Sequence, residues 1–109
     1  MKPLLQQHCQ HQSGVAMGDA QVQDHLAQLS SWKAEGGAIE KAFTFNNFHE
    51  TMAFVNALAW IAHTEDHHPD LQVSYNRCTV RFSTHSVGGL SVNDFICAAK
   101  TDALVSFVG

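Results

Sequence analysis

The sequence predicts an α+β domain with two layers, in which a four-stranded antiparallel sheet carries three helices on one face in the order αββαββα. Three segments of the 109 residues repeat apolar side chains at the 3.6-residue period of a helix, and the segments between them alternate at the period of two typical of strands. Hydrophobic residues make up 45% of the chain and charged residues 15%, which is enough apolar surface for one core. We therefore expect a single domain and exclude disorder for most of the chain.

Residues 1–18 are rich in Gln, His, Gly and Ser and show no sustained periodicity. We expect a flexible arm here, followed by one domain over residues 19–109. Cys9 and His11 could ligate a metal only together with a second pair of ligands, so an inert tail is the favoured interpretation.

The first helix is expected over residues 20–30, with Asp19 as its N-cap, because apolar residues follow at i, i+4 and i+7 (Val22, Leu26 and Leu29). Two β-prone segments, residues 32–34 and 39–45, then flank Glu35-Gly36-Gly37. Paired glycines between such segments are typical of a hairpin turn.

Asn47 and Glu50 have the spacing of a helix-capping pair and predict a helix from residue 48 to about residue 62, ended before Pro69. Its main apolar stripe is expected to contain Phe48, Met52, Val55, Leu58 or Ala59, and Ala62. A neighbouring face adds Phe54, Leu58 and Ile61. This is more apolar surface than one contact with a small sheet uses, so the helix predicts self-association into a dimer or tetramer.

Residues 71–75 and 78–83 alternate apolar and polar side chains and predict a second hairpin with Asn76-Arg77 as a two-residue turn. Gly88-Gly89 then breaks the chain. Ser91 and Asp94 form a capping box for the last helix, which bears Val92, Phe95, Ile96, Ala99 and Ala103. The expected register pairs Tyr75 with Cys78, Val73 with Val80 and Leu71 with Phe82.

The same register, extended past the strand ends, places His68 opposite His85. Three imidazoles, those of His67, His68 and His85, should therefore converge at one edge of the sheet. Because histidine titrates near neutral pH, such a cluster can hold a protonated acid and a neutral base together, which suits an elimination of water.

Two alternatives remain open for these residues. A His pair at a helix end can be simply solvated and favoured by the helix dipole. His63 and His67, four residues apart on one helical face, could also join His68, His85 or Asp66 around zinc. Thr64, however, follows His63 where the zincin pattern requires Glu. We therefore favour acid/base chemistry over a metal site.

The charge and apolar patterns exclude two classes of partner. Six Lys and Arg against ten Asp and Glu give a formal charge of -4 with no basic cluster, which argues against direct binding of nucleic acid. The longest apolar run, residues 57–62, is too short for a bilayer, and no secretory signal is expected. The odd set of Cys9, Cys78 and Cys97 lacks paired spacing and favours a reducing, cytoplasmic location.

Four parts of the sequence keep a joint spacing: Glu65-Asp66-His67-His68-Pro69, then Tyr75, then Ser83-Thr84-His85, and finally Asp94. This spacing resembles the signature of the pterin-4a-carbinolamine dehydratases, also called 4a-hydroxytetrahydrobiopterin dehydratases. The similarity extends from about Trp32 to Asp102. The fold of that family, a four-stranded antiparallel sheet with three helices, agrees with the order expected from periodicity.

The resemblance implies a hydro-lyase that removes water from 4a-hydroxytetrahydrobiopterin, the product of aromatic amino acid hydroxylases, without a metal or organic cofactor. His67 and His85 match the acid/base positions of the family, and His68 matches its main substrate-binding histidine. The residues expected to line or support the pocket are Asp66, Pro69, Ser83 and Thr84. His63 stands where mammalian-like members carry Glu, and Asp94 is expected mainly as a helix cap.

The resemblance also implies a second class of function, because some animal members act as dimerisation cofactors of a transcription factor through the same apolar helix. An intact set of three histidines would be idle in a pure interaction module. We therefore expect the enzyme, with an aromatic amino acid hydroxylase as a possible partner and no membrane or nucleic-acid partner.

Overall fold

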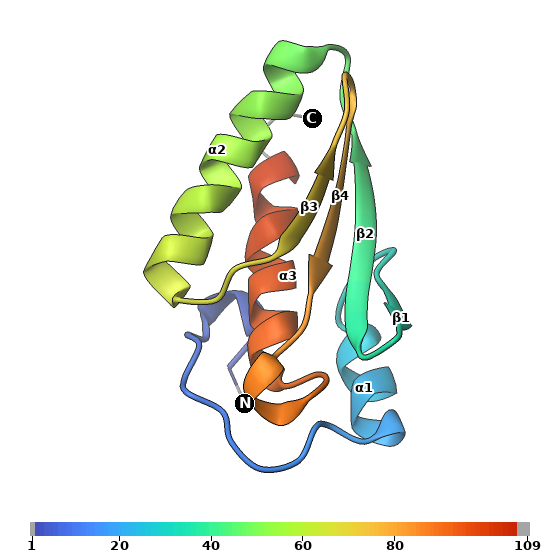
Figure 1. Cartoon of the computed structure of the whole chain (residues 1–109), viewed down its shortest axis with the longest axis vertical. Helices are drawn as coiled ribbons and strands as arrows, with labels where there is room; N and C mark the ends of the chain where they lie inside the picture. The colour runs from blue at the N-terminus through green and yellow to red at the C-terminus, as the bar shows by residue number, and fades with distance from the viewer. Residues whose placement is uncertain (1, 107–109) are drawn as a thin grey trace.

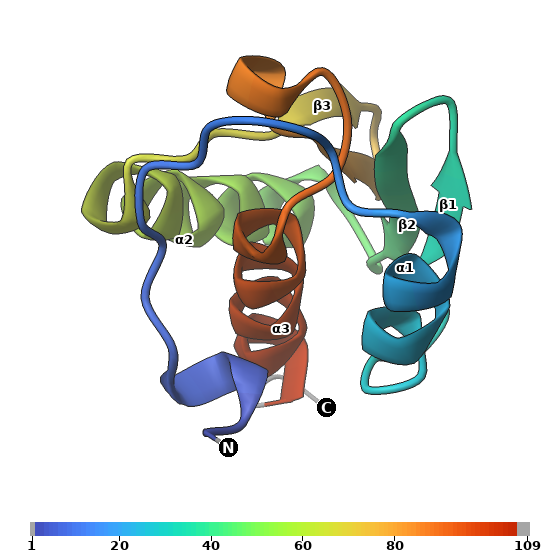
Figure 2. The ribbon, with the colours of Figure 1, turned by 90° about the horizontal axis from the view of Figure 1, so that it is seen from below.

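The computed structural model describes residues 2–106 of the chain. Its four strands form one antiparallel sheet in the order β1-β2-β4-β3, and three α-helices cover one face of that sheet (Figures 1 and 2). This confirms the predicted fold class. The elements in chain order are η1 (Leu4–Gln6), α1 (Asp19–Leu26), β1 (Lys33–Glu35), β2 (Ala38–Thr44), α2 (Phe48–Glu65), β3 (Asp70–Val73), β4 (Arg77–Phe82), η2 (His85–Val87) and α3 (Val92–Ser106).

The core lies between the sheet and the helices. Strand β4 shows the alternation most clearly, because its polar residues Thr79 and Arg81 keep some exposure while the residues between them are buried. The sheet contributes five buried side chains to the centre of the core: Ile39, Phe43, Cys78, Val80 and Phe82.

None of the helices in the described range is long and apolar enough to cross a membrane.

The first hairpin has a two-residue turn, Gly36-Gly37, one residue shorter than expected, because Glu35 still pairs with Ala38. Both glycines have positive φ, 59° and 76°, which residues with a Cβ adopt at a cost. The paired glycines therefore allow the chain to reverse within two residues, which places Glu35 opposite Ala38.

Helix α1 is shorter than predicted. Gly18 is its N-cap, Asp19 is its first helical residue, and the helix ends at Leu26. The chain then turns, with Ser31 at φ 68°. Leu29 lies after the end of the helix, but the turn there still packs its side chain against the core.

Helix α2 begins as predicted, with the Asn47 side chain accepting the N–H of Glu50 at 2.9 Å. Its buried face, however, is the one expected to be secondary. Phe48, assigned to the main stripe, is 50% exposed. The helix is thus rotated relative to the prediction, and the side chains directed into the core are Thr51, Phe54 and Leu58.

The second hairpin turns at Tyr75-Asn76 and not at Asn76-Arg77. Ser74 and Arg77 close the turn through a backbone hydrogen bond of 2.9 Å. The register is therefore shifted by two residues from the predicted one, which keeps every side chain on its expected face. The observed pairs are Leu71 with Val80 and Val73 with Cys78.

Residues 2–18 pack against the body of the domain. Leu4 is only 5% exposed, and its neighbour Leu5 accepts a hydrogen bond from Lys100 Nζ at 2.9 Å. In Figure 2 the segment leaves η1, passes the end of α2 and crosses to α1. In the structure the arm is therefore held by contacts with the domain, which differs from the loosely held segment expected. How mobile the arm is in solution remains a prediction.

Candidate active site

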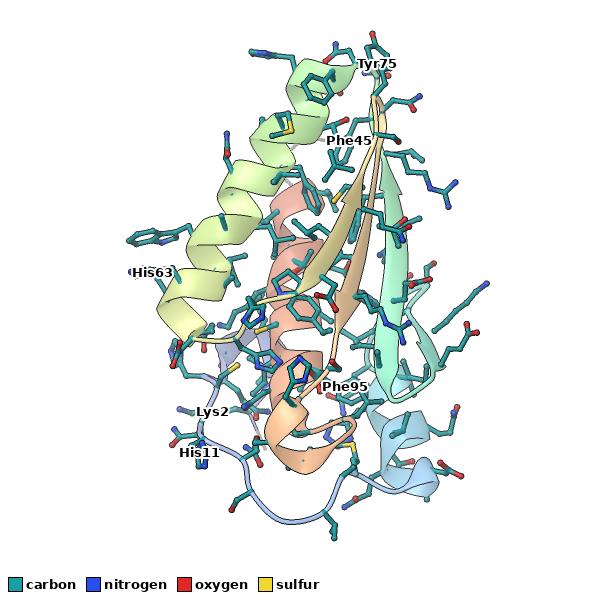
Figure 3. All side chains as sticks on the ribbon, in the orientation of Figure 1. Lys2, His11, Phe45, His63, Tyr75 and Phe95 are labelled. Carbon is teal, nitrogen blue, oxygen red and sulfur yellow. The ribbon has the colours of Figure 1, made fainter. Side chains whose placement is uncertain are left out.

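Three of the predicted functional histidines line one cavity of about 340 Å³, at the end of the molecule where α2, β4 and α3 meet the arm. These are His67, His68 and His85, and the predicted pocket residues Asp66, Ser83 and Thr84 line the same cavity. Pro69 does not line it. Figure 3 shows Tyr75 at the opposite end of the molecule from His11 of the arm.

The His67 ring is held on two sides. Its Nε2 lies 2.6 Å from Asp94 Oδ1, and its face stacks on Phe82 with ring centroids 6.0 Å apart and an interplanar angle of 12°. The side chain is 12% exposed. A carboxylate only accepts hydrogen bonds, so Nε2 carries the proton and a neutral ring leaves Nδ1 as the acceptor.

Asp94 is fully buried and accepts three hydrogen bonds. Besides His67, the donors are Thr84 Oγ1 at 2.8 Å and the backbone N–H of Ser91 at 3.0 Å. Thr84 gives its single hydroxyl proton to Asp94, so Ser91 must donate its own hydroxyl to Thr84, 2.8 Å away. Asp94 therefore caps α3, as predicted, and also orients His67, which the sequence did not indicate.

His68 and His85 reach the cavity from two strand ends. Asp66 adopts a left-handed conformation, φ 52°, which ends α2 and sends His67 and His68 toward β3. His85 begins η2 just after β4, in a loop closed by paired hydrogen bonds between Thr84 and Gly89. The shifted register no longer places His68 directly opposite His85, but β3 starts where β4 ends, so both still reach one cavity.

The geometry does not fit the zinc interpretation in its predicted form. Helix α2 ends at Glu65, so His63 and His67 do not share a helical face. His63 lies on the outer side of α2, beside Trp60 at 5.6 Å between ring centroids (Figure 3). Within residues 2–106, no group of three or more His, Cys, Asp or Glu side chains could hold a metal ion.

The sequence does not place seven further lining residues in the pocket: Cys9 and His11, which it offers only as weak metal ligands in the arm, Glu65, which it shows only as part of the family signature, and Gln10, Gln12, Ser86 and Asn93. Glu65 is buried beneath the arm, where its carboxylate accepts the N–H of Cys9 at 2.7 Å and pairs with His8 Nδ1 at 2.9 Å. Burial raises the pKa of Glu65, but the bonds from Cys9 and His8 and the charge of Lys100 outweigh it and leave the pKa lowered. In the sequence, Glu65 stands out only as the first residue of the signature Glu65-Asp66-His67-His68-Pro69, which does not reveal its contact with the arm.

Comparisons with known proteins identify the family of the chain. The family "Pterin 4 alpha carbinolamine dehydratase" matches residues 15–104. A protein of Stenotrophomonas maltophilia named "Putative pterin-4-alpha-carbinolamine dehydratase" is 58% identical over 94% of this chain and 91% of its own length. A protein of the same name from Chromobacterium violaceum is 56% identical over 93% of this chain and 94% of its own length.

Two solved structures share the fold. The "transcriptional coactivator/pterin dehydratase" of Brucella melitensis is 30% identical, with a TM-score of 0.79 over 82% of this chain and 97% of its own. A "pterin dehydratase-like protein" described as a RuBisCO assembly factor in the alpha-carboxysome is 24% identical, with a TM-score of 0.61 over 69% of this chain and 89% of its own, and shows the fold alone. By sequence match over most of its length, the chain belongs to the pterin 4 alpha carbinolamine dehydratase family of hydro-lyases.

Proposed function

We propose that this protein dehydrates 4a-hydroxytetrahydrobiopterin to quinonoid dihydrobiopterin and so recycles the pterin used by aromatic amino acid hydroxylases. The names of its relatives support a pterin dehydratase. The observation that carries the proposal is the group of three imidazoles on one cavity, with His67 fixed by the buried carboxylate of Asp94. Cavities of this size suit small heterocyclic ligands.

The reaction requires one proton acceptor and one proton donor on adjacent atoms of the pterin. His67 Nδ1, left free by the Asp94 contact, takes the proton from N5. The N5 electron pair then forms the C4a–N5 double bond, and the hydroxyl leaves C4a with a proton from protonated His85, as water. The step needs no metal or organic cofactor, because only protons move.

The other predicted site residues bind the substrate or support the geometry of the site. His68 is exposed on the cavity and acts as the main substrate-binding histidine, with Asp66 and Ser83 beside it. Thr84 directs its hydroxyl to Asp94, so it supports the orientation of His67. Pro69 restricts the backbone directly after His68 and acts on the shape of the site from outside the cavity.

We also infer that the working form is a homo-oligomer assembled on α2. An apolar groove of about 170 Å³ lies between α2 and the end of α3 and is lined by Phe45, Glu50, Ala53, Phe54, Ala57, Leu104 and Val105. Trp60 is 66% exposed on the same helix. A cytoplasmic location and contact with a hydroxylase remain predictions made from the sequence.

The direct test is a stopped-flow assay with 4a-hydroxytetrahydropterin generated in place. Dehydration well above the spontaneous rate is expected. A folded protein that leaves the spontaneous rate unchanged would contradict the proposal and favour the alternative, a regulatory interaction module. That alternative is supported by the words "transcriptional coactivator" in the description of the Brucella melitensis relative.

A further inference from the structure

One wall of the cavity comes from the N-terminal arm. Gln10, His11 and Gln12 line the cavity together with the histidines, although the family match begins only at residue 15. Figure 3 shows His11 on the arm, below the end of α2. The catalytic histidines come from other segments, so the arm is a separate part of the binding surface.

Two buried side chains fix the arm through its backbone. Glu65 accepts the N–H of Cys9 at 2.7 Å, and Asn93 brackets Gln10 by accepting its N–H at 3.2 Å and donating to its carbonyl at 2.7 Å. Asn93 is 6% exposed and Glu65 is 9% exposed. Burying such polar groups destabilises the fold unless they form hydrogen bonds. The backbone of the arm supplies hydrogen-bond partners that Glu65 and Asn93 would otherwise lack.

The arm and His67 are also held by neighbouring residues of α3. Asn93 and Asp94 are consecutive residues in the first turn of α3, and the first binds Gln10 while the second binds His67. Further along, Ser86 Oγ donates to the carbonyl of Gln12 at 2.7 Å, one residue after His85. The arm and the imidazoles are thus set at fixed positions relative to each other by the same short elements.

Two of the side chains that the arm contributes to the cavity, those of Gln10 and Gln12, are neutral amides. The Gln10 amide makes no hydrogen bond to any described residue, and Gln12 donates through Nε2 to Gln10 O at 3.3 Å while its Oε1 stays unpaired within residues 2–106. A side-chain amide presents an acceptor and donors side by side. The 2-amino-4-oxo edge of a pterin presents the complementary donors and acceptor. Its 2-amino and N3 end lies away from the reacting C4a and N5, while its 4-oxo carbon is bonded to C4a.

We propose that Gln10 and Gln12 are specificity-determining residues that bind the non-reacting 2-amino-4-oxo edge of the pterin, with Asn93 as the residue that positions them. The assignment rests on the proposed dehydratase function, and it extends the site to a segment outside the family match. His67, His68 and His85 act on the reacting atoms, and the arm recognises the heterocycle.

Kinetics of variants at these positions give the first test. Gln10→Ala and Gln12→Ala should each raise KM about three- to tenfold and leave kcat within about twofold, because a neutral hydrogen bond to bound ligand is lost. Gln10→Met keeps the length of the side chain and should behave like Gln10→Ala. Gln6→Ala is the matched control, since Gln6 is exposed on the same arm and does not line the cavity.

Selectivity between two ligands gives the second test and separates recognition from packing. The probes are 7,8-dihydropterin and the matching lumazine, in which a 2-oxo group replaces the 2-amino group, with dissociation constants measured by calorimetry. The wild-type protein should prefer the pterin by about tenfold, and Gln10→Ala, Gln12→Ala and Asn93→Ala should reduce that preference. Thermal unfolding of each variant confirms that it is folded at the assay temperature.

The outcomes keep the two proposals apart. Unchanged KM and unchanged pterin preference in the folded glutamine variants would overturn this inference, while normal wild-type turnover would leave the dehydratase function in place. A wild-type protein that binds both ligands equally would overturn it as well. Wild-type protein without turnover would contradict the dehydratase function itself, whatever the arm variants bind.

Discussion

At the scale of single residues, Asp94 joins the stability of the fold to the chemistry of the site. One carboxylate oxygen accepts the backbone N–H of Ser91 at the start of α3 and the hydroxyl of Thr84, and the other accepts His67 Nε2–H. The buried carboxylate is therefore fully paired, which offsets the cost of removing it from water. The orientation of the imidazole does not depend on a flexible contact, because its partner is part of a helix cap.

Replacing Asp94 by Asn should damage both roles. An amide presents a donor group either to Thr84 and Ser91 or to His67, and each of these already donates. We expect a loss of about 1–3 kcal/mol in the free energy of unfolding by urea, and a kcat lowered about ten- to a hundredfold through misplacement of His67. Asp24→Asn, exposed on α1, is the control; a variant at position 94 with wild-type kcat would show that His67 needs no carboxylate.

Variants of the three histidines should separate their roles. His67→Ala and His85→Ala should each lower kcat by about a hundredfold to ten-thousandfold with little change in the affinity for a product-like pterin, and the double variant should fall to the uncatalysed rate. His68→Ala should mainly raise KM. Steady-state kinetics and pterin binding are measured in parallel, with exposed His49→Ala as the control. Loss of turnover in His68→Ala with near-normal His67→Ala would reverse the assignment.

Metal removal should leave the reaction intact, since the proposed steps move only protons. After dialysis against a chelator, kcat and KM should match those of untreated protein. His63, the partner that a zinc site would need beside His67, lies on the outer side of α2 (Figure 3). Activity that disappears on chelation and returns with one equivalent of zinc would establish a metal enzyme instead.

At the scale of elements, the contact between the arm and α2 depends on an ionised carboxylate. Glu65 is buried and its pKa is lowered from 4.5, so the folded state binds its proton less tightly than the unfolded state. The stabilisation is fully present above the unfolded pKa and is lost as the pH falls through the folded pKa. The docking of residues 8 and 9 should therefore weaken in acid.

The pH dependence of unfolding tests this contact. Wild-type protein should be less stable to urea at about pH 4 than at neutral pH, and Glu65→Gln should reduce that difference while lowering stability at neutral pH. The change at neutral pH follows from losing the charged partner of His8 and Lys100. Glu35→Gln, exposed in β1, is the control. An unchanged pH profile in Glu65→Gln would show that other carboxylates govern the acid sensitivity.

The elements also show what could be predicted from the sequence and what could not. Alternation in residues 71–83 predicted two strands and their buried face, but a slip of two residues leaves the faces unchanged, so the turn could not be placed by pattern. Similarly, α2 carries apolar residues on adjoining faces, and only its packing selects Phe54 over Phe48. Contacts across long sequence separations, such as Asp94 with His67, leave no local pattern.

The arm illustrates the same limit most clearly. Its attachment runs through backbone groups of Cys9 and Gln10, which every residue type possesses, so composition indicated a loose tail. The predicted histidine cluster, in contrast, could be found because His67 and His68 lie just before β3 and His85 lies just after β4, and these two strand ends meet. The sequence thus predicted the part of the site supported by periodic elements and missed the part supported by irregular chain.

At the scale of the whole molecule, the outer side of α2 leaves apolar surface that no other part of residues 2–106 covers. The sequence analysis assigns Phe54 and Ile61 to the apolar face expected for self-association, but Phe54 is 6% exposed and Ile61 is half-buried, so a charge at either position would damage the core. Ala57 is exposed, lines the apolar groove and lies one turn from Trp60. It is the better position at which to probe association.

Ala57→Glu should convert the oligomer to a monomer without unfolding it. A new carboxylate in the apolar groove would have to lose water to be buried between copies, whereas in the monomer it stays solvated. Sedimentation velocity should show wild-type protein as a dimer or tetramer and the variant as a monomer with an unchanged far-UV spectrum; Gln23→Glu on exposed α1 adds the same charge as the control. Because His67, His68 and His85 all come from one chain, the monomer should keep measurable dehydratase activity. Wild-type protein that sediments as a monomer at working concentration would remove α2 as an interface between copies.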